Sequence, residues 1–100
     1  MGLIETYKEQ IERLCKSYKV KSLYSFGSVN TPRFSDQSDV DFIVDFNTTD
    51  PLEYSENYFN LKFDLERILS RSVDLLENKA TKNPFLRERI DRSKILIYGQ

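Results

Sequence analysis

Three aspartates stand out as the residues of this sequence best suited to chemistry, beginning with Asp39 and Asp41. They stand two residues apart in a segment that reads as a β-strand, so both side chains leave the same face, with Cα atoms about 6.6 Å apart. Two carboxylates this close repel each other unless a cation lies between them. Their oxygen atoms suit Mg²⁺, which prefers carboxylates together with substrate phosphates. The spacing therefore predicts a magnesium site.

Asp74 is the third carboxylate of this expected site. It lies in the strand-like segment SVDLLE, and a neighbouring strand would bring it within about 4.8 Å laterally. Two metal ions about 3.5–4 Å apart, held by such a set, activate a nucleophile and stabilise a leaving pyrophosphate. We therefore assign Asp39, Asp41 and Asp74 both metal-binding and catalytic roles.

A glycine–serine pair, Gly27 and Ser28, is separated from Asp39 by ten residues. Glycine lets a phosphate approach the backbone closely. The backbone N–H groups of a following helical turn, together with the Ser28 hydroxyl, would hold phosphate oxygens. Alone, an Asp-x-Asp pair is commonly solvated surface and Gly-Ser is only a turn signal. Their position at the ends of two predicted strands favours a nucleotide-phosphate site.

The elements that must position these residues can be read from hydrophobic periodicity and capping signals. The segment VDFIVDF alternates: Val40, Phe42, Val44 and Phe46 are expected on one face. The other face is expected to carry Asp41, Ile43 and Asp45, together with Asp39 just before the segment. Asp50-Pro51 and Asn83-Pro84 are typical helix starts. The pattern predicts helices over 3–18, 51–69 and 84–92 and strands over 20–26, 40–46, 72–77 and 94–98. Residues 1–100 are thus expected to form a single α/β (α+β) domain.

Composition excludes several classes of function. The 15 basic and 16 acidic residues nearly cancel, so nucleic acid is not favoured as the main partner. One cysteine and no histidine exclude a disulfide within the chain, Cys/His zinc sites and nucleophiles activated by histidine. No apolar run approaches the ~20 residues that span a membrane. The N-terminus lacks a signal-peptide pattern, and we expect a cytoplasmic protein.

Several other residues have a simple structural interpretation that we prefer. Cys15 is expected to be a buried small hydrophobe, and Asp45 a solvated or supporting carboxylate rather than a metal ligand. Tyr54 and Tyr58 fit a core stripe, although tyrosine is also favoured at interfaces. The last group is a basic cluster formed by Arg87, Arg89, Arg92 and Lys94. We interpret it as a solvated helix face, and the alternative is a docking surface for an acidic partner or tRNA.

The arrangement Gly27-Ser28…Asp39-Val40-Asp41 resembles the GS-x10-DxD signature of the DNA polymerase beta-like nucleotidyltransferases. The similarity is greatest to small prokaryotic minimal nucleotidyltransferase (MNT) proteins, often encoded beside HEPN-domain toxins as antitoxins. It extends over nearly the whole chain, including the NPFLRERI…ILIYG ending. It implies a nucleotidyltransferase fold, a small mixed β-sheet with helices packed mainly on one face.

By the same resemblance, Asp39, Asp41 and Asp74 would bind two Mg²⁺ ions, and Gly27 and Ser28 would hold the triphosphate of ATP. AMP would pass to a hydroxyl acceptor, a tyrosine of a HEPN toxin. The sequence departs from the family where Asn30, Thr31 and Pro32 replace a common Ala-Arg-Gly turn, and Arg33 is the candidate substitute for the missing arginine.

This departure leaves two other functions open. The chain could be a binding module that neutralises its partner by contact, or it could modify a small molecule such as an aminoglycoside. A domain this small would leave its site open on one side, so we expect a partner protein or a second subunit to close it.

Overall fold

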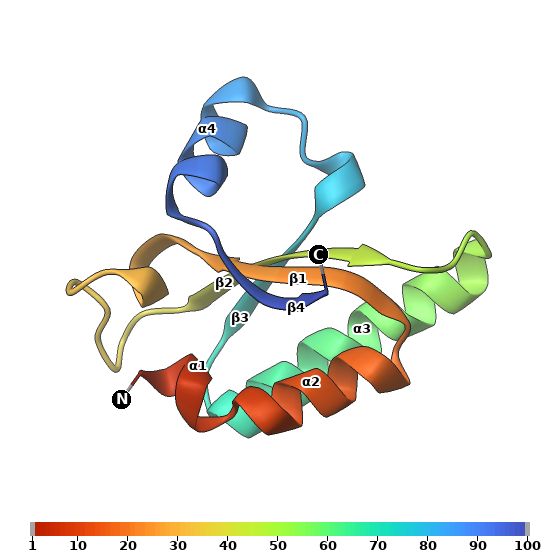
Figure 1. The fold of residues 1–100 in the computed structure, drawn as a ribbon, viewed down its shortest axis with the longest axis horizontal. Helices are drawn as coiled ribbons and strands as arrows, with labels where there is room; N and C mark the ends of the chain where they lie inside the picture. Colours follow the sequence, from red (N-terminus) through yellow and green to blue (C-terminus); the bar gives the residue numbers. More distant parts are fainter. Residues whose placement is uncertain (1, 100) are drawn as a thin grey trace.

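The computed structural model describes residues 2–99, which fold around one four-stranded β-sheet (Figure 1). Strands β1 and β2 and helix α3 have the predicted bounds, and the other two predicted strands and α4 differ by one residue at one or both ends. The elements follow in the order α1 (Leu3–Thr6), α2 (Lys8–Ser17), β1 (Val20–Phe26), the 3₁₀ turn η1 (Gly27–Asn30), β2 (Val40–Phe46), α3 (Pro51–Leu69), β3 (Val73–Glu77), the 3₁₀ turn η2 (Asn78–Ala80), α4 (Pro84–Ser93) and β4 (Ile95–Gly99).

The strands are ordered β3-β2-β1-β4 across the sheet. Strand β1 pairs antiparallel with both β2 and β4, whereas β2 and β3 run parallel. The parallel pair is joined by α3, a helical crossover of the kind that parallel neighbours need. The predicted small mixed sheet is confirmed.

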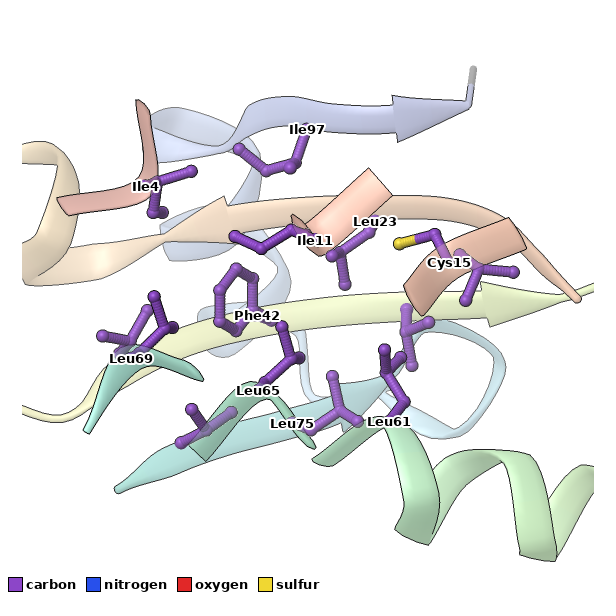
Figure 2. Close-up of a cluster of buried hydrophobic side chains, with 14 of the residues drawn as sticks. Ile4, Ile11, Cys15, Leu23, Phe42, Leu61, Leu65, Leu69, Leu75 and Ile97 are labelled. Carbon is purple, nitrogen blue, oxygen red and sulfur yellow. The ribbon is translucent and has the colours of Figure 1, made fainter. Parts of the chain in front are cut away.

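Helices cover the two faces of the sheet unequally. Helices α1, α2 and α3 lie on one face and α4 lies on the other (Figure 1). The larger core is between the sheet and the first three helices, where side chains such as Ile11, Phe42 and Leu65 have no solvent exposure (Figure 2). A smaller cluster of Phe26, Ile43 and Ile90 attaches α4 to the opposite face. The expectation of helices mainly on one face is therefore confirmed for three of the four.

The two predicted helix starts are built as their sequences indicate. Asp50 Oδ1 accepts a hydrogen bond from the Leu52 N–H (3.1 Å) and begins α3. Asn83 Oδ1 accepts from the N–H groups of Phe85 (2.9 Å) and Leu86 (3.2 Å) and begins α4. Each side-chain oxygen satisfies donors that have no partner within the helix.

The first predicted helix is interrupted. A continuous helix over 3–18 was expected, but α1 ends at Thr6 and α2 begins at Lys8. At Tyr7 the backbone takes φ −110° and ψ 16°, and the Tyr7 N–H bonds to the carbonyl of Ile4, three residues back (3.2 Å). The turn is tightened there, while Ile4 and Cys15 both still reach the core.

The tyrosines of α3 behave as core residues, as predicted. Tyr54 and Tyr58 pack against the larger core, and the Tyr58 hydroxyl donates to the Leu75 carbonyl (2.5 Å). Cys15 is fully buried in the same core. Within residues 2–99, the helices are too short or too polar for any of them to cross a bilayer.

Candidate functional site

Two of the three predicted aspartates are direct neighbours across the parallel strands. Asp41 of β2 pairs in register with Asp74 of β3. The residues flanking Asp74, Val73 and Leu75, face the larger core, so alternation turns both aspartates toward the α4 face. Asp39 comes just before β2 and is exposed. Strand alternation and parallel pairing thus gather the carboxylates at the N-terminal ends of β2 and β3.

The pKa of Asp41 reflects its burial and the charged groups near it. Burial raises the pKa of the Asp41 carboxyl above its ordinary value, and the nearby Asp74 and Asp39 raise that pKa further, while the Arg89 guanidinium opposes them. Burial and the neighbouring aspartates both raise this pKa, because the ionised carboxylate is desolvated and is repelled by like charges. The site therefore carries concentrated negative charge that a cation would relieve.

The donor atoms of Asp39, Asp41 and Asp74 fit Mg²⁺. They are carboxylate oxygens only, and Mg²⁺ is usually bound by one or two carboxylates plus substrate phosphates. Among residues 2–99, no group of three histidine, cysteine or acidic side chains is already arranged as a metal cage. Asp41 and Asp74 are the adjacent pair and Asp39 is the third member; Asp39 and Asp74 are exposed, and Asp41 is half-buried. The arrangement suits an ion that arrives with a phosphate ligand.

The predicted glycine turn lies directly against Asp41. Gly27 has φ +75°, and a Cβ added there would be 2.6 Å from Asp41 Oδ2. Only glycine fits both this left-handed backbone and the close approach. The Gly27 N–H donates to Ser93 Oγ of α4 (3.1 Å), which joins the turn to that helix.

Asn30 has a structural function that the sequence did not reveal. Its Oδ1 accepts from Ser25 Oγ (3.1 Å), and its Nδ2 donates to the carbonyls of Ser25 (3.2 Å) and Ser93 (2.9 Å). It therefore joins β1, the η1 turn and the end of α4. The departure from the Ala-Arg-Gly turn thus provides a bracket between elements.

A pocket of about 560 Å³ opens between the η1 turn and α4. Its volume falls within the roughly 300–1,000 Å³ common for small-molecule sites. Gly27, Ser28 and Arg33 line one side, so the predicted phosphate-binding residues meet at one place. The opposite wall is α4, which contributes Phe85, Glu88, Arg89, Arg92 and Ser93. None of the three aspartates lines this pocket directly; Gly27, which lies against Asp41, connects it to them. Another pocket, of about 370 Å³, lies near the N-terminus and also has no aspartate in its lining.

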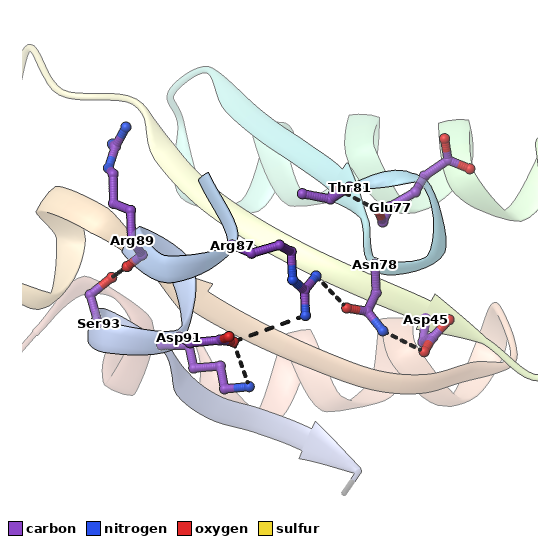
Figure 3. A network of polar contacts seen from close by, with 9 residues as sticks. Asp45, Glu77, Asn78, Thr81, Arg87, Arg89, Asp91 and Ser93 are labelled. Atoms are coloured by element: carbon purple, nitrogen blue, oxygen red, sulfur yellow. Dashed lines mark hydrogen bonds and ion pairs between the residues drawn. The ribbon is translucent and has the colours of Figure 1, made fainter. Parts of the chain in front are cut away.

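The basic cluster of α4 is not simply a solvated helix face, so that interpretation was wrong in part. Arg87 Nη1 donates to Asn78 Oδ1 (2.8 Å), and Asn78 Nδ2 donates to Asp45 Oδ2 (3.1 Å) (Figure 3). Asp91 pairs with Arg87 (3.9 Å) and Lys94 (3.1 Å). This network ties α4 to the sheet, and Asp45 serves it as a supporting carboxylate, in line with the preferred interpretation.

Arg89 and Ser93 are the site residues that sequence reasoning missed. Ser93 Oγ donates to the Arg89 carbonyl (3.0 Å) and accepts from the Gly27 N–H. The one available signal was their spacing: Phe85, Arg89 and Ser93 recur every four residues and so share one face of α4. Nothing in the sequence says which side of the sheet that face covers.

Comparison with known proteins gives the family. The family described as polymerase beta, nucleotidyltransferase matches residues 9–100, and the chain belongs to it. A relative from Methanocaldococcus jannaschii, provisionally named a protein adenylyltransferase, is 33% identical over 93 residues, which cover 93% of this chain and 92% of the relative.

Two solved structures extend this comparison. One, provisionally named a minimal nucleotidyltransferase, is 29% identical, with a TM-score of 0.75 over 95% of both chains. The other is a Shewanella oneidensis HEPN toxin, AMPylated three times, in complex with an MNT antitoxin. It is 20% identical, with a TM-score of 0.66 over 96% of this chain and 72% of that chain, and it supports the fold. The predicted nucleotidyltransferase fold and family are confirmed.

Proposed function

We propose that this chain transfers AMP from ATP to a hydroxyl group of a partner protein in a Mg²⁺-dependent reaction. The observation that carries the proposal is the meeting of Asp41 and Asp74, in register on parallel strands, with the Gly27 turn against Asp41. Asp39, Asp41 and Asp74 would hold Mg²⁺, which would supply positive charge to the phosphates. The reaction belongs in the cytoplasm, where ATP is abundant and the lone Cys15 stays reduced.

The chemistry needs little beyond positioning and charge. The acceptor oxygen attacks the α-phosphorus of ATP, its proton passes to Asp74 or to water, and the bond from the α-phosphorus to the bridging oxygen breaks. Pyrophosphate leaves with that electron pair. Nucleotidyl transfer of this kind depends mainly on alignment and electrostatic stabilisation, so the absence of histidine is no obstacle.

The acceptor we propose is a tyrosine of a HEPN-type toxin, and the effect of its modification is to silence the toxin. The M. jannaschii relative is provisionally named for protein adenylylation, and the AMPylated toxin complex shares the fold. We propose that residues 1–100 act as one minimal domain. Its pocket is open to solvent, which a docked partner would correct.

Incubation with α-labelled ATP, Mg²⁺ and the protein encoded by the adjacent gene tests this function. We expect label on a tyrosine of that partner, its loss on adding EDTA, and its loss in the double variant Asp39→Ala plus Asp41→Ala. Asp36→Ala, an exposed aspartate of the preceding loop, is the matched control and should keep full transfer. Transfer by the double variant at the wild-type rate would refute the proposal.

A contact-only antitoxin is the second candidate, because the turn that follows Ser28 carries no arginine at residues 30–32. The same experiment separates the two. If the Asp39→Ala plus Asp41→Ala variant inhibits the toxin as fully as the unchanged chain does and no label moves, contact alone is the function.

A further inference from the structure

Two of the seven arginines have guanidinium groups without a partner among the described residues. Within residues 2–99, Arg33 and Arg89 are the two whose guanidinium groups make no hydrogen bond or ion pair. The others are each occupied: Arg13 with Glu9, Arg67 with Asp64, Arg71 with backbone carbonyls, Arg87 with Asn78 and Arg92 with Glu88. Both uncommitted guanidinium groups line the pocket between η1 and α4.

The position of Arg89 relates it to the site. Its Nη2 is 3.7 Å from where a Gly27 Cβ would be, and it is close enough to Asp41 to act on that carboxylate. No ion pair joins Arg89 to an aspartate among the described residues, so its guanidinium can still bind another anion. Its side chain extends away from the polar network that anchors α4 (Figure 3).

The backbone around Arg89 is fixed although its side chain is free. Ser93 Oγ bonds to the Arg89 carbonyl and to the Gly27 N–H, which joins α4 to the turn at the point where Arg89 projects. Arg87, one of the neighbours of Arg89 on the helix, holds the same helix to η2. A guanidinium held on a rigid support loses little conformational freedom when it binds an anion.

We propose that Arg89 of α4 and Arg33 of the loop form a two-sided clamp on the β- and γ-phosphates of the nucleotide. The clamp replaces the arginine that the Asn30-Thr31-Pro32 turn lacks, and Arg89 supplies its main contact because it lies beside Gly27 and Asp41. A guanidinium matches phosphate geometry with paired N–H donors. Since these phosphates become the leaving pyrophosphate, the clamp also stabilises the charge that develops as the bond to the α-phosphorus breaks.

This inference rests on the proposed function, and direct binding separates the two. The probes are inorganic tripolyphosphate, ATP and AMP, each titrated with Mg²⁺ by calorimetry against the full chain. The variants are Arg89→Ala, Arg89→Lys and Arg33→Ala. The matched control is Arg67→Ala, an exposed arginine of α3 on the other side of the sheet that pairs with Asp64. Arg89 is exposed, so its variants should melt at the wild-type temperature.

For Arg89→Ala we expect the Kd for tripolyphosphate and ATP to rise about 10- to 100-fold, the loss typical of hydrogen bonds to charged groups. Arg89→Lys should recover part of the loss, Arg33→Ala should show a smaller one, and AMP binding should change least because AMP lacks the clamped phosphates. In labelled transfer, Arg89→Ala should lower kcat as well as raise KM.

Equal tripolyphosphate affinity in Arg89→Ala and Arg67→Ala, with the unchanged chain binding ATP, would overturn the clamp and leave the proposed function intact. Failure of the unchanged chain to bind ATP or tripolyphosphate at all would overturn both. A uniform loss for tripolyphosphate, ATP and AMP alike would also overturn the clamp, since it would show a general effect on the pocket.

Discussion

At Gly27 the backbone conformation and the contact with Asp41 both exclude every residue type but glycine. Its φ of +75° strains any side chain, and a Cβ would press on Asp41 Oδ2 at 2.6 Å. The cost therefore appears in two places, in the stability of the turn and in the position of a carboxylate that we assign to catalysis.

For Gly27→Ala we expect unfolding in urea to show a loss of about 1–2 kcal/mol from the left-handed backbone. Displacement of Asp41 should lower transfer on the order of 10²-fold, as misplacement by about 1 Å can do. The measurement is the rate per folded molecule. A rate that falls only in proportion to the unfolded fraction would show that the contact with Asp41 does not matter.

Cys15 offers a test of burial at the scale of one atom. Its side chain has no solvent exposure, and burial, with a smaller contribution from Glu12, raises the pKa of the thiol to about 12. Because the thiolate is the reactive form, the native protein should not react with an aromatic disulfide reagent at pH 8. In denaturing urea the same thiol should react within minutes. Rapid native reaction would mean that α2 opens readily.

The placement of the three aspartates could be predicted from the sequence, whereas the placement of Arg89 beside Gly27 could not, for a physical reason. Asp39, Asp41 and Asp74 are placed by local alternation along strands, and one pairing rule brings the strands together. Arg89 reaches the site because Ile90 packs on Phe26 and Ile43, a contact between residues more than 40 positions apart. A short helix with one buried residue carries little information about where it docks.

At the scale of elements, α4 is the part whose position matters most for the proposed nucleotide site. It is held by its cap, by the small cluster around Ile90 and by the network through Arg87 and Asn78. Its register on the sheet sets where Arg89 and Ser93 lie.

The two helix caps form a matched pair for testing this. Asn83→Ala and Asp50→Ala each remove a cap oxygen, and each should cost about 1 kcal/mol in urea unfolding. Only Asn83→Ala should weaken the binding of Mg²⁺ and ATP, by several-fold, because α4 lines the pocket and α3 lies on the other face. Equal ATP affinity in the two variants would show that the start of α4 does not position Arg89.

The interrupted first helix marks a limit of periodicity at the same scale. Apolar spacing predicted one helix over 3–18, and the spacing itself was right, since Ile11 and Cys15 are buried and Tyr7 packs against the same core. The break at Tyr7 leaves no trace in that pattern, because a single tightened turn changes the hydrogen bonding without moving the apolar face.

At the scale of the whole molecule, several acidic protons are held more tightly in the folded chain. Burial is the first cause of a raised pKa at Cys15, Tyr54 and Tyr58, and the hydrogen bond to Asp64 is the first cause at Tyr18. Above pH 9 the unfolded chain therefore binds fewer protons than the folded one.

Stability should consequently be level from neutral pH to about pH 9 and fall as the pH rises further, since the free energy of unfolding decreases wherever the unfolded state holds fewer protons. Cys15 alone should contribute a loss on the order of 2 kcal/mol between pH 9 and 11. Urea unfolding across this range provides the measurement, and Cys15→Ala should show a shallower decline. A free energy of unfolding that stays constant to pH 11 would contradict the tight burial of these groups.

The parallel register of β2 and β3 has a consequence for how errors in folding show themselves. Val73 and Leu75 are buried on one side of the strand that carries Asp74 on the other. A slip of one residue would drive the carboxylate into hydrocarbon and expel two aliphatic side chains into water, which the molecule could not tolerate. The same packing that stabilises the fold therefore also fixes the alignment of Asp41 with Asp74. A molecule that has folded has the two carboxylates in register, and a well-folded but misaligned form cannot accumulate.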